Sequence, residues 1–578
     1  MREGVLPTPL PALHAAALLL CLVLPWLNPF ASGPSPGVVP WLVTLAGVAG
    51  LRLLLPGAWP RAVWVGAAAG LAAVMLLRSV SSAGHNLLTV AVLLTMLMGA
   101  AVGRQAAHRP WLLKVVLAGW LLAGGISSGV ALLQYTGLAG ALSPWVNGTA
   151  LGEAFGNLRQ RNQFATLTSI ALVALCVAVG ARAPRTGGGG VSWATVGWAT
   201  GAVLLALLLA AGNAASASRT GLAQWGLLAL LFAVWGAWRV PAVRGLLLCA
   251  LVAYAFAVWA LPLLIGEAAG SRGLLARLAD GAPSCTSRKA LWSNVLELVA
   301  LKPWLGWGWG GLDQAHYLTL YSGPRFCDIL DNAHNLPLHL AVELGVPVAV
   351  LVCGAFGWAA LAARPWRAGS PVRQLGWGVL AVLLLHSGLE YPLWYGPFAL
   401  AFGIALGILW SGVAPEAAAG PSEANFKPNQ QSALVKSGAS AIVLVAFIGW
   451  VAWDYWRVSQ VYLPSDSRHP AYQADTLAKV RNTWWFSDPV QFAELTLTPL
   501  TRANAARVAQ QADALLSYSP EVRVIEKRIE AAALLGDDAE ALRHMARYRA
   551  AFPEAYAKWA RANVLLPRLL EQVAPASR

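Results

Sequence analysis

The sequence predicts an all-α polytopic membrane protein, and three observations lead to this fold class. Only 12% of the 578 residues are charged, whereas soluble domains carry about 25%. Hydrophobic residues make up 57% of the chain, and the mean hydropathy is +0.58. The apolar runs are about 17–25 residues long, which is the length at which a helix crosses a hydrocarbon core of roughly 30 Å.

About thirteen apolar runs are long enough to be transmembrane helices. The first, Pro9–Phe30, has no convincing cleavage site after it, so we expect it to be retained as a span. The predicted spans are 9–30, 37–55, 61–77, 84–103, 111–136, 163–181, 192–211, 221–238, 243–265, 335–362, 372–389, 393–411 and 438–455.

The net charge of +15 is explained by the positive-inside bias rather than by nucleic-acid binding. If the N-terminus is cytoplasmic, the even-numbered connections face the cytoplasm and are rich in arginine and lysine. The short outward connections carry little positive charge, mainly Arg78 and Arg219. This orientation places the polar segments 137–162, 212–220, 266–334 and 389–396 on the outer face, together with the chain after about residue 456.

The chain is expected to have four parts. They are an N-terminal transmembrane bundle (1–265), a large external loop (266–334), C-terminal transmembrane helices (335–455) and an external helical domain (456–578). In the last part, segments 502–516, 521–535, 538–551 and 554–570 have apolar residues at helical spacing and resemble tetratricopeptide-type arrays. Such arrays bind partners on concave surfaces. The alternative is that this domain only caps the membrane part.

The large loop is expected to be ordered. Leu291–Leu301 has helical apolar spacing, and the Gly/Trp run 304–311 has the composition of a packed turn. Cys285 and Cys327 both lie in this loop, while the other four cysteines lie in predicted spans. Two cysteines confined to one exported loop suit a disulfide. Two free thiols are the alternative.

Four polar clusters are predicted on the outer face. Arginines and amides next to hydrocarbon are costly to leave unpaired, although snorkelling side chains and lipid contacts are alternatives. A guanidinium group there is suited to phosphate oxygens. The clusters are NLRQRNQ at 157–163, SASRTG at 216–221, Arg288-Lys289 with GWGWGG at 306–311, and EYPLWYGP at 390–397.

The stretch DNAHNLPLHLAVELG at 331–345 adds a histidine to these clusters. His334 lies at a helix start, where it is either a packed residue or a general base, because an unperturbed imidazole has a pKa of about 6.5. A metal site is not expected, since His334 and His339 fall on different helix faces and no HExxH pattern is present. We expect no metal and no cofactor. A base beside cationic groups suggests transfer from a phosphate-activated donor.

These five motifs together resemble the bacterial protein O-oligosaccharyltransferases that glycosylate pilins, within the superfamily of O-antigen ligases and polymerases. The resemblance is carried by NLRQRNQ, SASRTG, Arg288 to Leu312, DNAHNLPLHLAVELG and EYPLWYGPF at 390–398. It implies a GT-C-like glycosyltransferase in the inner membrane whose active site and C-terminal domain face the periplasm. The implied reaction transfers an oligosaccharide from undecaprenyl diphosphate to a Ser or Thr hydroxyl, with inversion and without a metal.

The resemblance also implies roles for individual residues. His334 is the expected base on the acceptor hydroxyl, Gln160 is expected to be essential, and either Tyr391 or Tyr395 is functional. Arg219 is expected to contact the donor diphosphate, with Arg288 as a second clamp. Further cationic groups are Arg161 and Lys289, and the expected supporting residues are Asn162, Asn335 and Glu390.

The helical C-terminal domain favours a periplasmic protein, such as a pilin, as the acceptor. The alternatives are an O-antigen ligase, which uses lipid A–core as the acceptor, and an O-antigen polymerase. A transporter is disfavoured, because the predicted spans are nearly free of charge and the two halves show no internal repeat.

Overall fold

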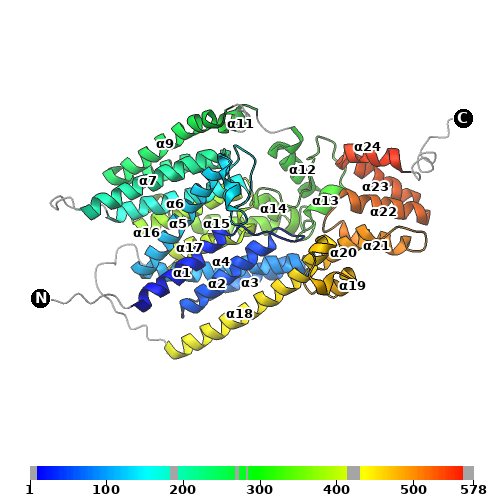
Figure 1. Ribbon diagram of the computed structural model, residues 1–578, viewed down its shortest axis with the longest axis horizontal. Helices are drawn as coiled ribbons and strands as arrows, with labels where there is room; N and C mark the ends of the chain where they lie inside the picture. Colours follow the sequence, from blue (N-terminus) through cyan, green and yellow to red (C-terminus); the bar gives the residue numbers. More distant parts are fainter. Residues whose placement is uncertain (1–8, 183–192, 267–272, 281–283, 413–429, 564–578) are drawn as a thin grey trace.

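The computed structural model describes residues 9–182, 193–266, 273–280, 284–412 and 430–563. Within these residues the protein is helical, and β pairing is limited to an isolated bridge between Ser79 and Trp309. Long helices lie side by side in one bundle, and shorter helices gather at one end of it (Figure 1). The all-α membrane fold expected from the sequence is therefore confirmed.

Each predicted span contains at least one helix. Seven helices of the described residues are long and apolar enough to cross a membrane, and five shorter apolar helices accompany them. Up to the large loop, the bundle helices are α1 Pro9–Leu27, α2 Val38–Leu54, α3 Ala62–Leu77, α4 Ala83–His108, α5 Pro110–Tyr135, α6 Arg161–Arg182, α7 Trp193–Ala215, α8 Arg219–Val234 and α9 Pro241–Ile265. After the loop they are α14 Leu336–Leu344, α15 Val346–Ala362, α16 Pro371–Ser387, α17 Gly396–Leu409 and α18 Gln430–Ser459.

The expectation of one continuous span over 335–362 is wrong. The chain breaks at Gly345, which has φ +91° and separates the short helix α14 from α15. A side chain at this position would overlap the carbonyl of Trp304, so the loop chain approaches the backbone directly. Only glycine tolerates both the backbone conformation and the close approach.

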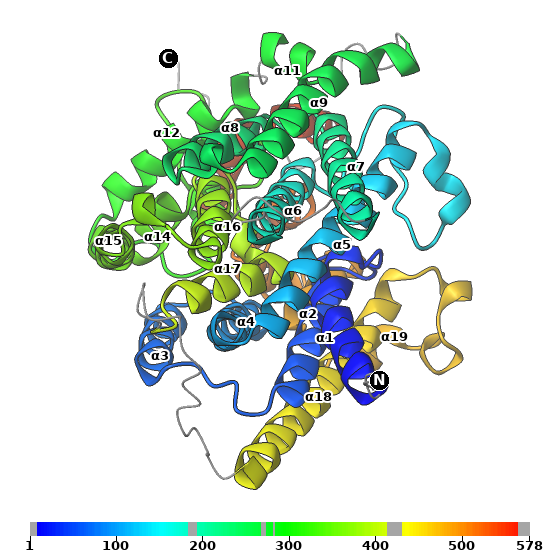
Figure 2. The same ribbon diagram turned by 90° about the vertical axis from the view of Figure 1, so that its left-hand side faces the viewer.

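Helix α6 lies at the centre of the bundle, surrounded by α5, α7, α8 and α16 (Figure 2). Its side chains from Gln163 to Val177 are buried without interruption. Protein rather than lipid therefore covers every face of this part of α6. The N-terminal end of α6 is therefore held in a fixed position, and the NLRQRNQ segment runs directly into it.

Helices α4 and α17 approach each other through glycines. Gly99 and Gly103 of α4 face Gly403 and Gly407 of α17, and a Cβ atom at Gly403 would overlap the Met96 carbonyl oxygen. Small residues four apart allow two membrane helices to pack backbone against backbone. This contact fixes α17, which begins immediately after the polar turn at 388–395.

The large loop folds against the bundle rather than standing apart from it. It contains α11 Leu274–Asp280, α12 Arg288–Leu301 and α13 Leu312–Leu318. The apolar face of α12 packs on Phe326, Leu330 and, from α14, Val342. Short 3-10 turns occur at Leu138–Leu142, Ala237–Arg239, Ser284–Thr286, Pro365–Arg367, Pro392–Trp394, Gln460–Tyr462, Ser465–Ser467 and Pro470–Tyr472.

The C-terminal domain is a helical array, as predicted. Its helices are α19 Thr476–Val480, α20 Ser487–Leu497, α21 Ala505–Leu515, α22 Val522–Leu535, α23 Asp538–Ala551 and α24 Pro553–Ala562. Residues 564–570 of the last predicted helix lie outside the described residues. Helix α18 runs along the edge of the bundle and leads into this domain (Figure 1).

The C-terminal domain contacts the rest of the chain on two sides. The buried carboxylate of Asp454, at the end of α18, accepts hydrogen bonds from Thr483 Oγ1 (2.8 Å) and the Trp484 amide (3.0 Å). On the loop side, Tyr317 of α13 is buried in the core of the domain, and its hydroxyl lies 2.8 Å from His544 Nδ1. The loop and the C-terminal domain thus share one hydrophobic core.

We predict that Gly403→Val will destabilise the protein, because the added side chain must separate α4 from α17. We expect a cost of about 1–3 kcal/mol from overpacking, measured as a lower apparent Tm and a smaller folded peak on size-exclusion chromatography. Gly66→Val is the matched control, because a Cβ atom at Gly66 of α3 meets nothing within 4 Å. Equal effects of the two variants would contradict the close contact.

Candidate functional site

Residues from the polar clusters that the sequence predicts for the outer face meet at one buried carboxylate. Glu390 follows α16, in the turn before α17, and is only 9% exposed. Its backbone amide donates to the His386 carbonyl (2.8 Å), a helix-type hydrogen bond that continues the last turn of α16. This position directs the side chain into a space between chain segments that are far apart in sequence.

Four side chains from three other segments contact the Glu390 carboxylate. Gln160 Nε2 donates to Oε2 (3.0 Å), and Asn162 Nδ2 donates to Oε1 (3.1 Å). Arg288 Nη2 donates to Oε1 (2.7 Å), and His334 Nδ1 lies 3.4 Å from Oε2. Both carboxylate oxygens are thus occupied, which is what a buried charge requires.

The amide side chains before α6 extend this network. Gln160 Oε1 accepts the backbone amide of Gln163 (2.9 Å) and thereby caps the start of α6. Asn162 Oδ1 accepts a hydrogen bond from Ser218 Oγ (2.6 Å). Ser218 in turn is the N-cap of α8 and accepts the Gly221 amide (3.0 Å). The chain of hydrogen bonds therefore runs from Glu390 to the helix that begins with Arg219.

His334 is held in an unusual backbone conformation, with φ +50°. Its amide donates to Asn332 Oδ1 (2.9 Å), and the next residue, Asn335, is the N-cap of α14. Asn335 Nδ2 also donates to the Gly388 carbonyl (3.0 Å), which joins this turn to the turn that carries Glu390. Non-glycine residues with positive φ persist only where the surroundings fix them, and they are frequent at functional sites.

The His334 ring is oriented by two contacts. Nδ1 faces Glu390, and the ring meets Tyr391 edge-to-face at 5.0 Å between centroids. Nε2 makes no hydrogen bond within the described residues, and the side chain is 28% exposed. A carboxylate at Nδ1 favours the tautomer with the proton on Nδ1, which leaves Nε2 as a proton acceptor.

The two candidate tyrosines differ in position. Tyr391 lies against the His334 ring, whereas Tyr395 stacks on Tyr391 at 5.9 Å and lies one step further from the histidine. Burial raises the pKa of Tyr391, so its phenol stays protonated and is available as a donor. Tyr391 is thus the one of the two tyrosines whose ring contacts His334.

The predicted cationic residues are not equivalent. Arg288 is held twice, by the Glu390 carboxylate and by the Leu389 carbonyl (2.9 Å from Nε). Arg161 pairs with Glu153 (2.6 Å) rather than with Glu390. Arg219 is half-buried and pairs with no carboxylate among the described residues. Lys289 is exposed and makes none of the contacts around Glu390.

Two residues of the site were missed by sequence reasoning. Ser218 lies within the SASRTG motif, and its serine–glycine spacing signals an N-cap. Arg277 of α11 donates from Nη1 to the Ala217 carbonyl (2.7 Å), at the turn before Arg219. A lone arginine in a long loop has no sequence signal that distinguishes it from a solvated one.

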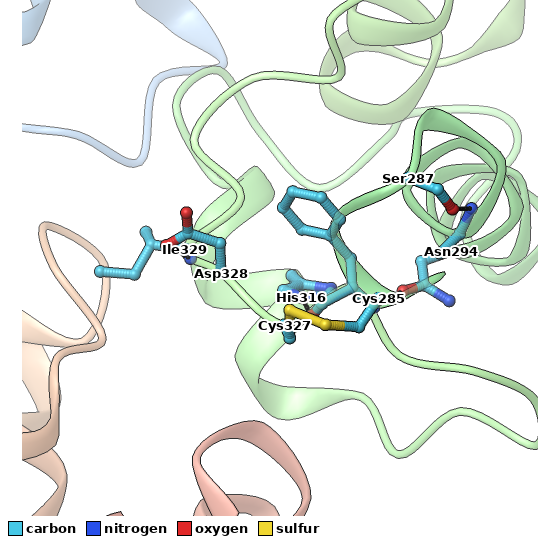
Figure 3. The surroundings of a disulfide bond; sticks show 9 residues. Cys285, Ser287, Asn294, His316, Cys327, Asp328 and Ile329 are labelled. Atoms are coloured by element: carbon cyan, nitrogen blue, oxygen red, sulfur yellow. Dashed lines mark hydrogen bonds between the residues drawn. A yellow bond between two sulfur atoms is a disulfide. The ribbon is translucent and has the colours of Figure 1, made fainter. Parts of the chain in front are cut away.

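Cys285 and Cys327 form a disulfide, and Figure 3 shows its surroundings. The bond joins the segment three residues before Arg288 to the segment that leads to His334. Next to it, Asn294 of α12 donates to the Pro324 carbonyl (3.0 Å) and accepts the Phe326 amide (2.8 Å). The disulfide and Asn294 together tie the two loop segments that carry site residues.

The electrostatics of the site keep Glu390 ionised. Burial alone would raise the pKa of Glu390, but its hydrogen bond to His334 and the positive charge of Arg288 help to outweigh this, so the pKa lies below the usual 4.5. Within the described residues, no group of three or more His, Cys, Asp or Glu side chains is arranged to hold a metal ion. The site thus presents a fixed carboxylate, a half-exposed imidazole and several guanidinium groups.

Three family models match the sequence. A protein glycosylation ligase model matches residues 154–177, which include Gln160 and Asn162. An O-antigen ligase model matches residues 202–353, which include Arg288 and His334. The C-terminal model of a virulence factor membrane-bound polymerase matches residues 374–566, which include Glu390. The comparison with curated proteins gives no match.

We predict that Glu390→Gln will lower stability at neutral pH, because it leaves Arg288 without its carboxylate. Since the Arg288 side chain is 31% exposed, we expect a cost of about 1–3 kcal/mol, between the values for exposed and buried pairs. A depressed pKa in the folded state stabilises the protein above pH 4.5, and this contribution is lost as the pH falls through the folded value. The Tm gap between variant and wild type should therefore be full at pH 7 and shrink below pH 4.5. A gap that is constant with pH would contradict an ionised Glu390.

We predict that Cys285→Ser will destabilise the loop. The bond closes a separation of 42 residues, for which chain entropy gives roughly 4 kcal/mol. The expected result is a lower Tm for this variant and for reduced wild type. Cys249→Ser is the control, because Cys249 is a free cysteine of α9. A Tm of Cys285→Ser equal to that of the control would show that the bond adds no stability.

Proposed function

The chain belongs to the O-antigen ligase superfamily, and we propose that it transfers an oligosaccharide from undecaprenyl diphosphate to a Ser or Thr hydroxyl of a protein. The observation that carries this proposal is the contact of His334 Nδ1 with Glu390 (3.4 Å), which leaves Nε2 for an acceptor proton. A hydroxyl is a weak nucleophile, and a positioned base contributes about 10²–10⁴-fold to its reaction.

In the proposed reaction, the acceptor hydroxyl oxygen attacks the anomeric carbon of the donor sugar while His334 Nε2 takes the hydroxyl proton. The bond between the anomeric carbon and the phosphate oxygen breaks, and its electron pair leaves with undecaprenyl diphosphate. A single displacement of this kind inverts the anomeric configuration. Glu390 stabilises the imidazolium that forms, and it orients the ring throughout.

The leaving diphosphate gains negative charge in this step. Arg288 is fixed in place by Glu390 and the Leu389 carbonyl, and Arg219 lies at the end of the Asn162–Ser218 hydrogen bonds. Guanidinium groups that are fixed before the reaction stabilise developing charge without reorganisation. We assign both to the donor diphosphate. Tyr391, which contacts the His334 ring, is the tyrosine that we assign to the site.

A protein acceptor is supported by the match to the protein glycosylation ligase model at 154–177 and by the helical array at the C-terminal end of the chain. The array shares a core with the loop that carries Arg288, so an acceptor bound there would lie near the site. This assignment places the site and the array in the periplasm, outside the bacterial inner membrane. A pilin is the acceptor class that we would test first.

The second candidate is an O-antigen ligase, in which the same base and clamp act on a hydroxyl of lipid A–core. It is favoured by the larger extent of the O-antigen ligase match, residues 202–353. The two functions share the donor and the mechanism and differ only in the acceptor.

We predict a mass increase on a pilin that is co-expressed with this protein and a lipid-linked glycan pathway, measured by intact-protein mass spectrometry. His334→Ala should reduce the initial rate of pilin glycosylation by about 10²–10⁴-fold, and its membrane insertion should be unchanged. His108→Ala, at the exposed end of α4, is the control and should retain activity. Glycan found only on lipopolysaccharide would move the assignment to ligase, and full transfer by His334→Ala would exclude the base role.

A further inference from the structure

The short helix α11 places an additional arginine beside the site. Helix α11 lies just beyond the end of α9 in both views (Figures 1 and 2). Its Arg277 is half-buried, and Nη1 donates to the Ala217 carbonyl at 2.7 Å. Ala217 has φ +50° and precedes Ser218 and Arg219 directly. The hydrogen bond therefore holds the Arg277 guanidinium at the turn from which Arg219 extends.

Arg277 lies within the electrostatic reach of three other arginines. Burial lowers its pKa, and the positive charges of Arg161, Arg219 and Arg288 lower it further. An arginine nevertheless stays protonated in a protein. The Arg277 guanidinium is therefore repelled by three other guanidinium charges, and its hydrogen bond to the Ala217 carbonyl places it two residues from Arg219 along the chain.

Carboxylates balance only half of this charge. Glu153 pairs with Arg161 and Glu390 pairs with Arg288. Among the carboxylates whose side chains the structure describes, none pairs with Arg219 or Arg277; the side chain of Asp280 is outside this set. Partly buried cations without counter-charges are unfavourable until an anion binds. Guanidinium groups are matched to phosphate oxygens in particular, because their donors form a planar fork.

We propose that Arg277 is a further donor-binding residue that acts with Arg219 as a pair on the two phosphate groups of the donor. This inference rests on the proposed function. A diphosphate that links a sugar to a lipid has one ionised oxygen on each phosphate, so its two charges match the two unpaired arginines. Arg288, whose charge Glu390 already neutralises, then stabilises the negative charge that develops on the leaving oxygen.

The position of Arg277 fits this division of roles. One nitrogen of its guanidinium is used by the Ala217 carbonyl, while Nε and Nη2 make no hydrogen bond among the described residues. The backbone contact orients the group without neutralising it, because a carbonyl carries no net charge. Because the N–H groups of Arg277 are oriented before binding, less entropy is lost when the diphosphate binds.

Binding of a diphosphate without transfer is the experiment that tests Arg277. The full-length protein would be placed in zwitterionic lipid nanodiscs and titrated with farnesyl diphosphate, with the Kd measured by calorimetry. We expect both Arg277→Ala and Arg277→Gln to raise this Kd by about tenfold or more, the effect of losing a charge-assisted hydrogen bond. Arg502→Ala, which removes an exposed charge in the C-terminal domain, is the matched control and should leave the Kd unchanged.

The glutamine variant separates binding from a structural role, because its amide nitrogen can still donate to the Ala217 carbonyl. A wild-type Kd for Arg277→Gln would overturn the proposal and leave Arg277 as a residue that only holds the turn. A second titration in nanodiscs that contain phosphatidylglycerol distinguishes the source of the phosphate. If binding of phosphatidylglycerol depended on Arg277 but binding of farnesyl diphosphate did not, the proposal would also be overturned, and Arg277 would instead contact a lipid headgroup.

These outcomes are independent of the acceptor. Diphosphate binding that depends on Arg277 would stand even if no protein were glycosylated, in which case only the proposed function fails. Glycan transfer to a pilin with an unchanged Kd in both Arg277 variants would support the function and reject the role of Arg277. Failure of the wild type to bind farnesyl diphosphate would reject the assignment of Arg277 to the donor.

Discussion

The buried carboxylate of Glu390 is the constraint on which the site depends. It receives Gln160 and Asn162 from the start of α6, Arg288 from α12 and His334 from the turn before α14. A buried anion without partners would be strongly unfavourable, so these segments must meet for the fold to be stable. The same contacts orient an imidazole and fix an arginine. The Glu390 side chain therefore both stabilises the meeting of these segments and positions His334 and Arg288.

The fold around Glu390 is rigid where the site needs it to be. The close glycine contact between α4 and α17 fixes the helix that follows the Glu390 turn, and the central helix α6 fixes the amides. The disulfide and Asn294 tie the loop segments that carry Arg288 and His334. Arg219 and Arg277 are joined to this framework through the Asn162–Ser218 hydrogen bond and the Ala217 carbonyl.

Hydropathy predicted the membrane helices because burial in lipid requires long apolar runs, and the helical spacing after residue 500 predicted the C-terminal array. Hydropathy did not predict the break at Gly345, because glycines are also common inside continuous transmembrane helices. Motifs identified His334 and Glu390 separately. Their contact was not predictable, since it joins positions 56 residues apart through the packing of α14 on the 388–390 turn. Arg277 was missed because only the tertiary contact with Ala217 distinguishes it.

We propose that the groups around Glu390 form the donor and acceptor site. The most direct measurement is a cryo-electron microscopy structure of the His334→Ala protein in nanodiscs with an undecaprenyl-diphosphate-linked glycan. We predict diphosphate density within hydrogen-bond distance of Arg219 and Arg288, with the anomeric carbon facing the space vacated by the imidazole. Density for the diphosphate away from both arginines, with the sugar remote from position 334, would contradict it.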